Sequence, residues 1–588
     1  MAMLSPGVEV LEIDASGIVP TVSNSIAVFG GSFTQGPTNT YTLITNASDL
    51  VTYYGTPTAS NYNDWYQCKT FLDYGNLLLV SRGLSSTAAN ASYICQGRTY
   101  TTDMTTAIVT AANSSVIGNE TDYENESNSI VFPSETTVVP VLKFLSKNPG
   151  AWGNDIQIAI AKPSDFVKTP TISNPAKYAF SGISLNDQFD YFPGTSANSV
   201  SGYDEFAVIV KYKDLIVETF IVSFSTAARD ANNKSMYVES LINSQSKYVY
   251  VKVNDAVAGT LSGDNIIDSY IHSNNTGHTD FALVSGSDGI YGGVAGALTA
   301  GEISNAYDIF SNKEEIDIDI VIANEGNILA AVNLAEGRQD CIAFLGATYG
   351  DTVGQAASDA VANIISWRTE GEANINSSYV VVGANYMNVY DKYADKYRWI
   401  NVAGTLAGLR AQTNTNLASW WASAGLERGQ LLNVNKLAFN PNQGQRDFLY
   451  KNGLNPIVSF PGQGVVLWGQ KTLLDKPSSF DRVNVRGLFI TLERALWKMA
   501  KYQVFEFNDS FTRNRISAMI NPFLATVQAG RGIQDYLVVC DTTNNTPDII
   551  SRNQLIVDVY IKPTYVAEFI QLRFTNAGTN SFASIIGA

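Results

Sequence analysis

The sequence predicts a multidomain protein of the α/β and α+β classes, with a core built from N- and C-terminal parts of the chain and β-rich domains inserted between them. Three observations support this. Strand and helix patterns alternate in residues 21–82 and again in 300–425, which is typical of a mostly parallel sheet covered by helices. Residues 83–299 are rich in Ser, Thr and Asn and show short alternating runs. The last quarter combines a clear amphipathic helix with further strands.

The first 20 residues contain few helix signals. The turn-forming Ser5, Pro6 and Gly7 are followed by alternating apolar positions at Val8 and Val10. This pattern predicts an extended N-terminal arm over residues 1–20. Because an apolar strand at the end of a chain needs a sheet edge to pair with, we expect the arm to find one elsewhere.

The core domain is expected to combine residues 21–82 with residues 300–425. Apolar runs that end in glycine or arginine indicate buried strands, and amphipathic stretches indicate helices. In the first part we expect strands near 25–30 and 77–82 and helices near 46–54 and 64–74. In the second part we expect strands near 316–322, 341–344 and 379–382 and helices near 326–336, 352–367 and 402–411.

The middle of the chain is expected to form two inserted outer β-rich domains. The smaller one covers residues 83–145 and contains the polar acidic loop GNETDYENESNS at 118–129. The second covers residues 146–299, where strand-like runs recur. These runs lie near 156–160, 206–210, 216–222 and 248–252.

Residues 426–588 are expected to form a C-terminal domain that ends in an arm. Its strands are predicted at 536–540, 554–561 and 565–574. Pro563 between the last two indicates a break or an edge rather than a central strand. The residues proposed for an arm strand in the last run are Tyr565, Ile570, Leu572 and Phe574.

The stretch from Pro477 to Tyr502 carries both the clearest helix pattern and a local positive charge. Apolar residues recur at spacings of three and four and line one face. Arg494, Lys498 and Lys501 lie within about 60° of one another around the helix, since each residue advances about 100°. The four basic residues of interest here are Arg486, Arg494, Lys498 and Lys501. A charge run alone is also explained by a solvated helix face.

The charge distribution along the whole chain is uneven. The chain contains 38 Lys and Arg against 54 Asp and Glu, for a formal net charge of −16. Between Lys392 and Arg531, however, 18 basic and 8 acidic residues give +10, which leaves −26 elsewhere. The basic segment is therefore expected to meet an acidic partner, for which nucleic acid, an acidic protein surface and the chain's own acidic part all qualify.

Composition indicates a folded protein of several domains with no export or membrane signal. The length of 588 residues and the 45% hydrophobic content suffice for several cores. The N-terminus lacks a charged and apolar leader, and no run of about 18 apolar residues occurs. The four cysteines, Cys68, Cys95, Cys341 and Cys540, are far apart, so reduced thiols in a cytoplasmic product are expected.

Catalytic and ligand-binding motifs are weak. His272 and His278 lie in a polar segment that indicates an ordinary loop, with neither metal-site spacing nor a hydrolase motif. The segment from Gly464 to Thr472 resembles a phosphate loop, but an extra Gln470 disturbs the spacing, so a turn or surface loop is the alternative. The glycine-rich segment 289–296 is interpreted as a flexible connection between domains.

Asp317 and Asp319 lie two apart on an apolar strand and are predicted to project to the same face. Paired carboxylates of this kind occur in acid-base catalysis. A solvated strand end or a salt bridge explains them equally well, and no further residue completes a catalytic site.

Several short segments occur together in a characteristic order. They are LSPGVE from Leu4, DC from Asp340, SWR from Ser366, YDKY from Tyr390 with RW from Arg398, RGQ from Arg428, QRD from Gln445, FDRVNVR from Phe480 and CDTTNNTP from Cys540. Together they resemble the contractile tail sheath proteins of T-even-like bacteriophages. The resemblance covers roughly residues 1–82 and 300–588 and is most specific in the last 200.

The resemblance implies a structural protein of the virion, not an enzyme, with no cofactor and no metal. Such subunits stack as hexameric rings in a helix around an inner tail tube and contract to drive the tube through the host envelope. The implied partners are further copies of the chain, the tube protein, the baseplate and the tail terminator, with no direct nucleic-acid contact and no membrane insertion. Assembly is implied to take place in the host cytoplasm.

The resemblance also suggests roles for the residues named above. In this family the terminal arms add strands to sheets of neighbouring subunits, the C-terminal domain lies innermost and inserted domains lie outside. Val8 and Val10 together with the last strand would be the intersubunit strands. We expect Arg486, Arg494, Lys498 and Lys501 to face the inner tube.

Three alternatives remain open at the level of sequence. The nearest is the sheath of a related contractile injection or secretion system. A nucleic-acid-binding protein would explain the basic segment, although no nucleic-acid motif accompanies it. A carbohydrate-binding adhesin would explain the β-rich middle and the 11% aromatic residues, and it predicts glycan binding within residues 146–300.

Overall fold

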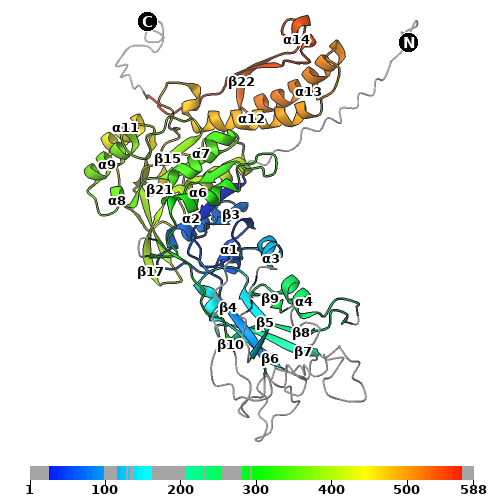
Figure 1. Cartoon of the computed structure of the whole chain (residues 1–588). Helices are drawn as coiled ribbons and strands as arrows, with labels where there is room; N and C mark the ends of the chain where they lie inside the picture. Colours follow the sequence, from blue (N-terminus) through cyan, green and yellow to red (C-terminus); the bar gives the residue numbers. More distant parts are fainter. Residues whose placement is uncertain are drawn as a thin grey trace, which may run out of the picture.

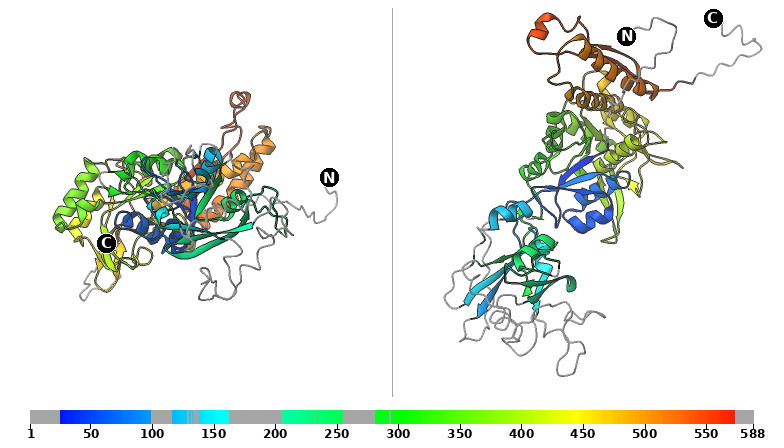
Figure 2. Two further views of the ribbon diagram at one scale, coloured as in Figure 1. Left: turned by 60° about the horizontal axis from the view of Figure 1, so that its bottom comes forward. Right: turned by 90° about the vertical axis from the view of Figure 1, so that its right-hand side faces the viewer.

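The structure, a computed structural model, describes residues 25–98, 116–127, 130, 132, 138–161, 205–230, 232–254, 281–291 and 294–572. These residues form three units, with a central body between an inserted unit and a C-terminal unit (Figures 1 and 2). We use "central body" for residues 25–82 and 296–482, "inserted unit" for the described residues of 83–295, and "C-terminal unit" for residues 483–563.

The central body is organised around a seven-stranded sheet in the order β19-β15-β14-β13-β1-β3-β2. All neighbours in it are parallel except the β2–β3 pair. The strands are β19 (Leu454–Asn455), β15 (Val380–Gly383), β14 (Ile342–Gly346), β13 (Ile320–Ile322), β1 (Ala27–Gly31), β3 (Leu78–Arg82) and β2 (Tyr41–Ile44).

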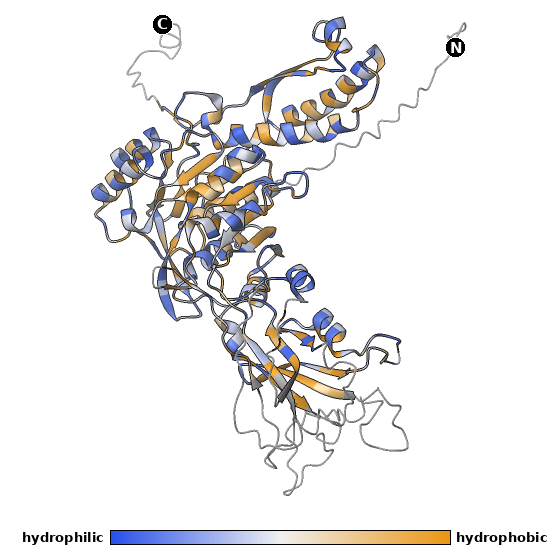
Figure 3. Cartoon of the chain, in the orientation of Figure 1, coloured by the Kyte–Doolittle hydropathy of each residue, from blue (hydrophilic) through white to orange (hydrophobic). Residues whose placement is uncertain are grey.

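Both faces of this sheet are covered by helices, so its strands are apolar on both sides. In β1, Phe29 belongs to one core cluster and Val28 to the other. The helices over the Phe29 face are α1 (Ala47–Tyr54), α2 (Tyr62–Leu72) and α10 (Ala403–Asn416). Those over the Val28 face are α6 (Ala300–Asp308), α7 (Ile328–Arg338), α9 (Ala357–Thr369) and α11 (Gln443–Lys451). Figure 3 shows the apolar residues concentrated in these strands.

Local signals in the sequence explain several of these elements. Asn46 precedes α1 and its side chain accepts hydrogen bonds from the backbone N–H groups of Ser48 and Asp49, as expected for a helix N-cap. Thr299 and Glu302 form a reciprocal capping box at the start of α6. The strand order of the central sheet and the helices on both of its faces confirm the expected, mostly parallel sheet covered by helices.

Two smaller sheets and a short helix complete the central body. One sheet contains β17 (Lys396–Asn401), β16 (Tyr386–Asp391) and β18 (Lys436–Leu437). The other is a hairpin of β20 (Ile457–Phe460) and β21 (Gly464–Leu467), and α8 spans Tyr349–Thr352. The segment Gly464–Thr472, whose spacing disfavours a phosphate loop, begins with hairpin strand β21 rather than with the expected turn or surface loop.

The inserted unit contains a four-stranded and a three-stranded antiparallel sheet that share one apolar core, and a separate two-stranded sheet of β11 and β12. Its strands are β4 (Ser92–Arg98), β5 (Val138–Ser146), β6 (Ile156–Ala161), β7 (Glu205–Tyr212), β8 (Leu215–Ser223), β9 (Val249–Val253), β10 (Phe281–Ala282), β11 (Ile290–Tyr291) and β12 (Val294–Ala295). Its helices are α3 (Glu120–Glu126) and α4 (Val238–Gln245). The segment expected to be a flexible connection at 289–296 contains the paired strands β11 and β12.

Arg82 holds the inserted unit against the central body. This side chain is 4% exposed and its guanidinium donates hydrogen bonds to the carbonyl oxygens of Phe33, Gly36 and Pro149 at 2.9, 3.0 and 2.8 Å. Burial lowers the pKa of Arg82 to about 10. Because the acceptors lie on both sides of the junction, the two units meet through a fixed polar contact.

Backbone pairing crosses two of the expected domain boundaries, and the domain division itself stays a prediction. Strand β5 spans the boundary at 145/146 and pairs with β9 far beyond it, and both inserted segments contribute to one core. Strand β19, beyond the boundary at 425/426, pairs with β15 in the central sheet. The expected boundaries were placed where the amino-acid composition changes, and composition does not show which distant segments pair through their backbones.

The C-terminal unit projects from the central body as two long helices covered by a hairpin (Figures 1 and 2). The helices are α12 (Val483–Lys501) and α13 (Ser510–Ala529), and the short α14 spans Pro547–Ser551. The hairpin strands are β22 (Ile533–Val539) and β23 (Asp558–Pro563). These elements enclose a separate small core.

Candidate functional site

Helix α12 connects the C-terminal unit to the central body. Its apolar positions Val485, Leu488, Leu492 and Met499 are buried, which confirms the predicted amphipathic helix. Leu488 and Leu492 pack in the core of the C-terminal unit, whereas Val483 and Ile490 contribute to the core of the central body. The helix therefore has two buried faces rather than one.

The basic residues of α12 meet the two aspartates singled out in the sequence. The guanidinium of Arg494 forms a salt bridge with the carboxylate of Asp319 and donates hydrogen bonds to the carbonyl oxygens of Ile318 and Asp340 at 2.6 and 2.7 Å. The ammonium of Lys498 lies 3.0 Å from the carboxylate of Asp317. Of the explanations left open for this aspartate pair, the structure thus shows salt bridges.

The two ion pairs differ in their environment. Both side chains of the Arg494–Asp319 pair are 6% exposed, whereas Lys498 and Asp317 are 25% and 52% exposed. Burial raises the pKa of Asp319 to about 6, although Arg494 and the backbone N–H of Ile26 oppose this change. The carboxylate is therefore still ionised at neutral pH, and the buried pair fixes α12 to the start of β13.

Arg486 is also enclosed within the subunit. It is 7% exposed, and its guanidinium carbon lies 4.4 Å from the ring centre of Tyr379 and 4.1 Å from that of Phe480, as in cation–π contacts. Burial lowers the pKa of Arg486. Its position between two rings leaves little of this charge available to a partner protein.

Of the four residues expected to face a tube, only Lys501 is fully on the surface. Its ammonium lies 5.1 Å from the ring centre of Trp497, which is itself 51% exposed. The sequence pattern located the basic residues on α12 correctly, but it could not show that the central body covers Arg486 and Arg494. Tube contact stays a prediction, and in the described conformation it concerns Lys498 and Lys501.

The hairpin of the C-terminal unit has open edges. Strands β22 and β23 pair from Ile533 with Pro563 to Val539 with Asp558, and neither pairs with a third strand among the described residues. A two-stranded sheet leaves backbone N–H and C=O groups unpaired along both edges, and such edges accept further strands.

The segment that follows β23 makes most of its hydrogen bonds to the subunit through Glu568, and the hydroxyl of Tyr565 adds one with the hydroxyl of Ser479 at 2.8 Å. The guanidinium of Arg482 donates hydrogen bonds to the carboxylate of Glu568 at 2.7 and 3.0 Å. The hydroxyl of Tyr450 and the amide of Gln470 donate to the same carboxylate at 3.0 and 3.1 Å. Glu568 therefore fixes the point at which the C-terminal segment leaves the subunit.

The last predicted strand does not form in this subunit. Residues 564–572 have no strand structure, and Tyr565, Ile570 and Leu572 are 61%, 79% and 74% exposed. The prediction of a strand is therefore wrong for residues 565–572 of the single subunit, which pair with neither open edge of the β22–β23 hairpin. The remaining arm residues, Val8, Val10 and Phe574, lie outside the described residues.

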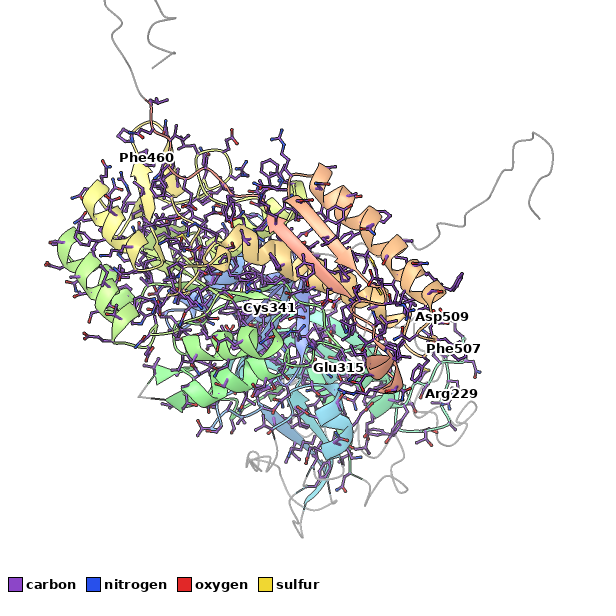
Figure 4. All side chains as sticks on the ribbon, turned by 90° about the horizontal axis from the view of Figure 1, so that it is seen from above. Arg229, Glu315, Cys341, Phe460, Phe507 and Asp509 are labelled. Atoms are coloured by element: carbon purple, nitrogen blue, oxygen red, sulfur yellow. The ribbon has the colours of Figure 1, made fainter. Side chains whose placement is uncertain are left out.

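An exposed group of aromatic and apolar side chains lies at the turn between α12 and α13, and we call it the aromatic turn. Phe505 has a positive φ of 75°, and Figure 4 shows Phe507 at the rim of the molecule beside Asp509. A cavity of about 1060 Å³ opens next to it between α12, α13 and the loop before β23. Its exposed members are Tyr502 (77%), Val504 (60%), Phe505 (103%), Phe507 (84%) and Phe511 (73%).

Sequence analysis missed the aromatic turn. The signal was present in YQVFEF between Tyr502 and Phe507, where large apolar residues follow the end of a helix without continuing its periodicity. A contiguous exposed apolar patch of this kind marks an interaction surface. The turn and the open hairpin place two such surfaces in one unit.

No group of three or more His, Cys, Asp or Glu side chains that could hold a metal ion occurs among the described residues, and His272 and His278 lie outside them. Cys68, Cys341 and Cys540 are buried free thiols. No helix in the described part of the chain is both long and apolar enough to span a bilayer.

Comparison with known proteins points to a single family. Residues 296–473 match the phage tail sheath protein central domain, and residues 475–576 match the phage tail sheath C-terminal domain. The second match includes α12, α13, the hairpin and the Glu568 segment. Both matches lie outside the inserted unit.

Full-length relatives agree with these domain matches. The tail sheath protein of Vibrio phage KVP40 is 31% identical and the alignment covers all of both chains. The tail sheath protein of Enterobacteria phage T4 is 29% identical over 99% of this chain and 98% of its own. The crystal structure of the sheath tail protein from Desulfitobacterium hafniense has a similar fold, with a TM-score of 0.50 at 11% identity over 95% of this chain and all of that chain.

Proposed function

This chain belongs to the phage tail sheath protein family, and from this premise we propose that its subunits stack as hexameric rings around an inner tail tube and contract to drive that tube through the host envelope. The protein is a structural component of a contractile bacteriophage tail. The proposal includes assembly in the host cytoplasm and contacts with the baseplate and the tail terminator.

The observation that carries this proposal is the unpaired β structure of the C-terminal unit. The hairpin of β22 and β23 lacks a third strand among the described residues. Beyond Glu568, the apolar side chains of Phe569, Ile570 and Leu572 are exposed and lie in no strand. An open edge and an unpaired strand-forming segment in one chain are complementary in the manner of β-augmentation. Exchange of arms between subunits would satisfy both.

Complementary surfaces of different kinds on one subunit lead to rings or helices rather than closed pairs. The arm of one copy and the hairpin of the next form such a heterologous contact. Tyr565, Ile570, Leu572 and Phe574 would belong to the C-terminal arm, and Val8 and Val10 to the N-terminal arm. The aromatic turn would add apolar contact area in the same unit.

The tube is proposed to meet the exposed end of α12. Lys498 and Lys501 lie in the last turn of this helix, and exposed ion pairs contribute only about 0 to 1 kcal/mol each. Contacts of this strength would keep the sheath in register and release on contraction. The proposed layout places residues 426–588 innermost, the core of 21–82 with 300–425 around them, and the inserted segments 83–145 and 146–299 outside.

The test compares the purified full-length chain with a variant that lacks residues 1–20 and 564–588, both viewed by negative-stain electron microscopy. We expect hollow tubes of uniform width from the full-length chain and single particles from the variant. A third variant with Glu568→Gln keeps both arms and measures how much the loss of the Arg482–Glu568 ion pair contributes to the effect of the truncation. Single particles from the full-length chain, with and without added inner tubes, would contradict the proposal.

The same architecture in a contractile injection or secretion system is the alternative. Under both hypotheses the chain forms a contractile sheath. The two hypotheses differ in the genes expected next to the gene for this chain. Genes for capsid and tail-terminator proteins beside this one favour the phage, whereas their absence together with genes for secreted effectors favours the alternative.

A further inference from the structure

A cleft of about 700 Å³ lies where the inserted unit meets the central body. One wall comes from residues 35–42 and from the end of α1, and the other comes from α3 and from residues near 148 and 248. Both this volume and a position at a junction between two units are typical of sites for small molecules.

The walls of the cleft are held together by hydrogen bonds across the junction. The backbone N–H of Thr38 donates to the carbonyl oxygen of Gly118 at 3.1 Å, and the amide of Asn119 donates to that of Thr38 at 2.9 Å. Arg82 bridges Gly36 and Pro149 nearby. The cleft is therefore formed before a ligand arrives, which removes the cost of ordering it on binding.

Aromatic side chains line both walls. Tyr53 at the end of α1 is 48% exposed, and Tyr248 on the opposite wall is partly exposed. Trp152 and Tyr250 lie more deeply in the same lining. The negative face of an aromatic ring attracts groups with a positive edge, and the C–H groups on one face of a pyranose ring present such an edge.

The polar lining suits hydroxyl groups better than an ion. Carboxylates of Glu120 and Asp122 accept hydrogen bonds, and amides such as those of Gln35 and Asn39 both donate and accept. The side chains of Lys147 and Lys247 also line the cleft, so two positive charges balance two negative ones. Because these charges balance, a strongly charged ligand would gain little electrostatic binding energy in the cleft.

Lys147 is occupied by other contacts. Its ammonium donates to the carbonyl oxygen of Asn243 at 3.0 Å and lies 4.0 Å from the ring centre of Tyr250. Burial lowers its pKa. This residue is consequently a part of the wall rather than a free cation for a phosphate or sulfate.

Two buried donors in the lining lack partners within the described part of the chain. They are the indole N–H of Trp152 and the hydroxyl of Tyr250, whose side chains are 9% and 1% exposed. Buried donors without an acceptor are unfavourable. Both atoms are closed to solvent, so they lie behind the lining, and the residues that would contact a ligand are the exposed ones in front of them.

The geometry points to a carbohydrate site: the cleft binds a neutral oligosaccharide, with a pyranose ring against Tyr53 and hydroxyl groups that donate to Asp122 and Glu120. This role does not depend on assembly of the sheath. It assigns a function to the inserted unit, which lies outside the two family matches because these begin at residue 296.

The test is calorimetric titration of the full-length protein with neutral trisaccharides of glucose, galactose, mannose and N-acetylglucosamine. We expect at least one to bind and its affinity to fall at least about tenfold in Tyr53→Ala, which corresponds to about 1.4 kcal/mol. Tyr53→Phe keeps the ring and should restore binding. Tyr390→Ala is the matched control, because Tyr390 is also 48% exposed but lies outside the cleft.

Three results would overturn this inference. They are the absence of binding by all four sugars, binding that Tyr53→Ala leaves unchanged, and stronger binding of inorganic phosphate than of any sugar. Circular dichroism spectra that match the unsubstituted protein show that Tyr53→Ala is folded. If that variant unfolds, Asp122→Asn on the opposite wall takes its place and should weaken binding to a similar extent.

Discussion

The central body and the C-terminal unit bury their apolar residues to very different degrees. In the central body both faces of a seven-stranded sheet are covered, and strand β14 is buried at every position. In the C-terminal unit a two-stranded sheet lies on two helices, and Phe505 and Phe507 are 103% and 84% exposed. The first region buries its apolar side chains within the subunit, whereas the second leaves several large apolar side chains on its surface.

The largest effect expected from this contrast comes from matched truncations of phenylalanine in the two regions. Phe344 in β14 is 2% exposed, so Phe344→Ala should lower the free energy of unfolding by about 3–5 kcal/mol. Phe507→Ala should change it by less than about 0.5 kcal/mol but reduce polymer formation. Urea unfolding of the subunit and sedimentation of polymers measure the two quantities. If Phe344→Ala and Phe507→Ala lower the free energy of unfolding equally, the proposed difference between the central body and the C-terminal unit is wrong.

The junction between the regions should depend on the buried ion pair. Arg494→Met leaves the carboxylate of Asp319 buried without its partner, and we expect a loss of about 3–5 kcal/mol in unfolding free energy. The double variant Arg494→Met with Asp319→Asn should recover more than half of this loss. Chemical unfolding measures both. If the single and double variants are equally unstable, the aspartate charge is not the cause.

The central body should also show a pH dependence that arises from Asp64. This partly buried carboxylate accepts hydrogen bonds from the backbone N–H of Ser32 and the amide of Asn324 at 2.8 and 2.9 Å, and burial raises its pKa to about 6. Since the folded state holds this proton more tightly than the unfolded chain, the stability that Asp64 contributes is present below about pH 4 and lost as the pH rises through 6.

The measurement is the melting temperature of the subunit with and without Asp64→Asn between pH 4 and 7. The unsubstituted protein should lose roughly 2 kcal/mol at most relative to the variant across this range. Asp49→Asn is the control that should leave the pH dependence in this range unchanged. Hydrogen bonds from Thr45 lower the pKa of Asp49, so its contribution to stability is lost only as the pH falls below about 4. Parallel curves for the protein and Asp64→Asn would exclude the titration of this residue as a cause.

The smallest effect is expected at the exposed ion pair beside the buried one. Lys498→Met should change the free energy of unfolding by about 0 to 1 kcal/mol, because Lys498 and Asp317 are both open to water. Charge reversal by Lys498→Glu together with Lys501→Glu should impair assembly on inner tubes at an unchanged melting temperature. Normal assembly of this double variant would exclude the end of α12 as the tube contact.

Much of the central body was predictable from sequence because its elements carry local signals. The cap at Asn46, the apolar runs of β1 and β14 and the periodicity of α12 were read correctly, although β13 is shorter than the run expected at 316–322. These signals describe one segment at a time. The adjacency of β5 and β9, or of β15 and β19, depends on segments far apart in the chain and has no local signature.

The candidate site was predictable only in part for the same reason. Amphipathicity places Arg494 off the face that packs in the C-terminal unit, but it does not show that β13 covers the opposite side. The alternation of Ile570 and Leu572 predicts a strand, but a strand forms only where its backbone pairs with a sheet edge. In this subunit the segment pairs with neither edge of the β22–β23 hairpin. The spacing of Asp317 and Asp319 suggested paired carboxylates, and their partners lie 175 or more residues away.

The inserted unit leaves and re-enters the central body at nearly the same place. The backbone N–H of Gly83 donates to Gly31 in β1 at 2.9 Å, and a methyl carbon of Leu298, just before α6, lies against Gly83. Excursions with adjacent ends are the sites at which foreign domains are grafted successfully. Residues 84–297 could therefore be replaced by another folded domain whose ends lie close together. A polymer of such a chimeric chain would display the chosen enzyme or antigen at regular spacing.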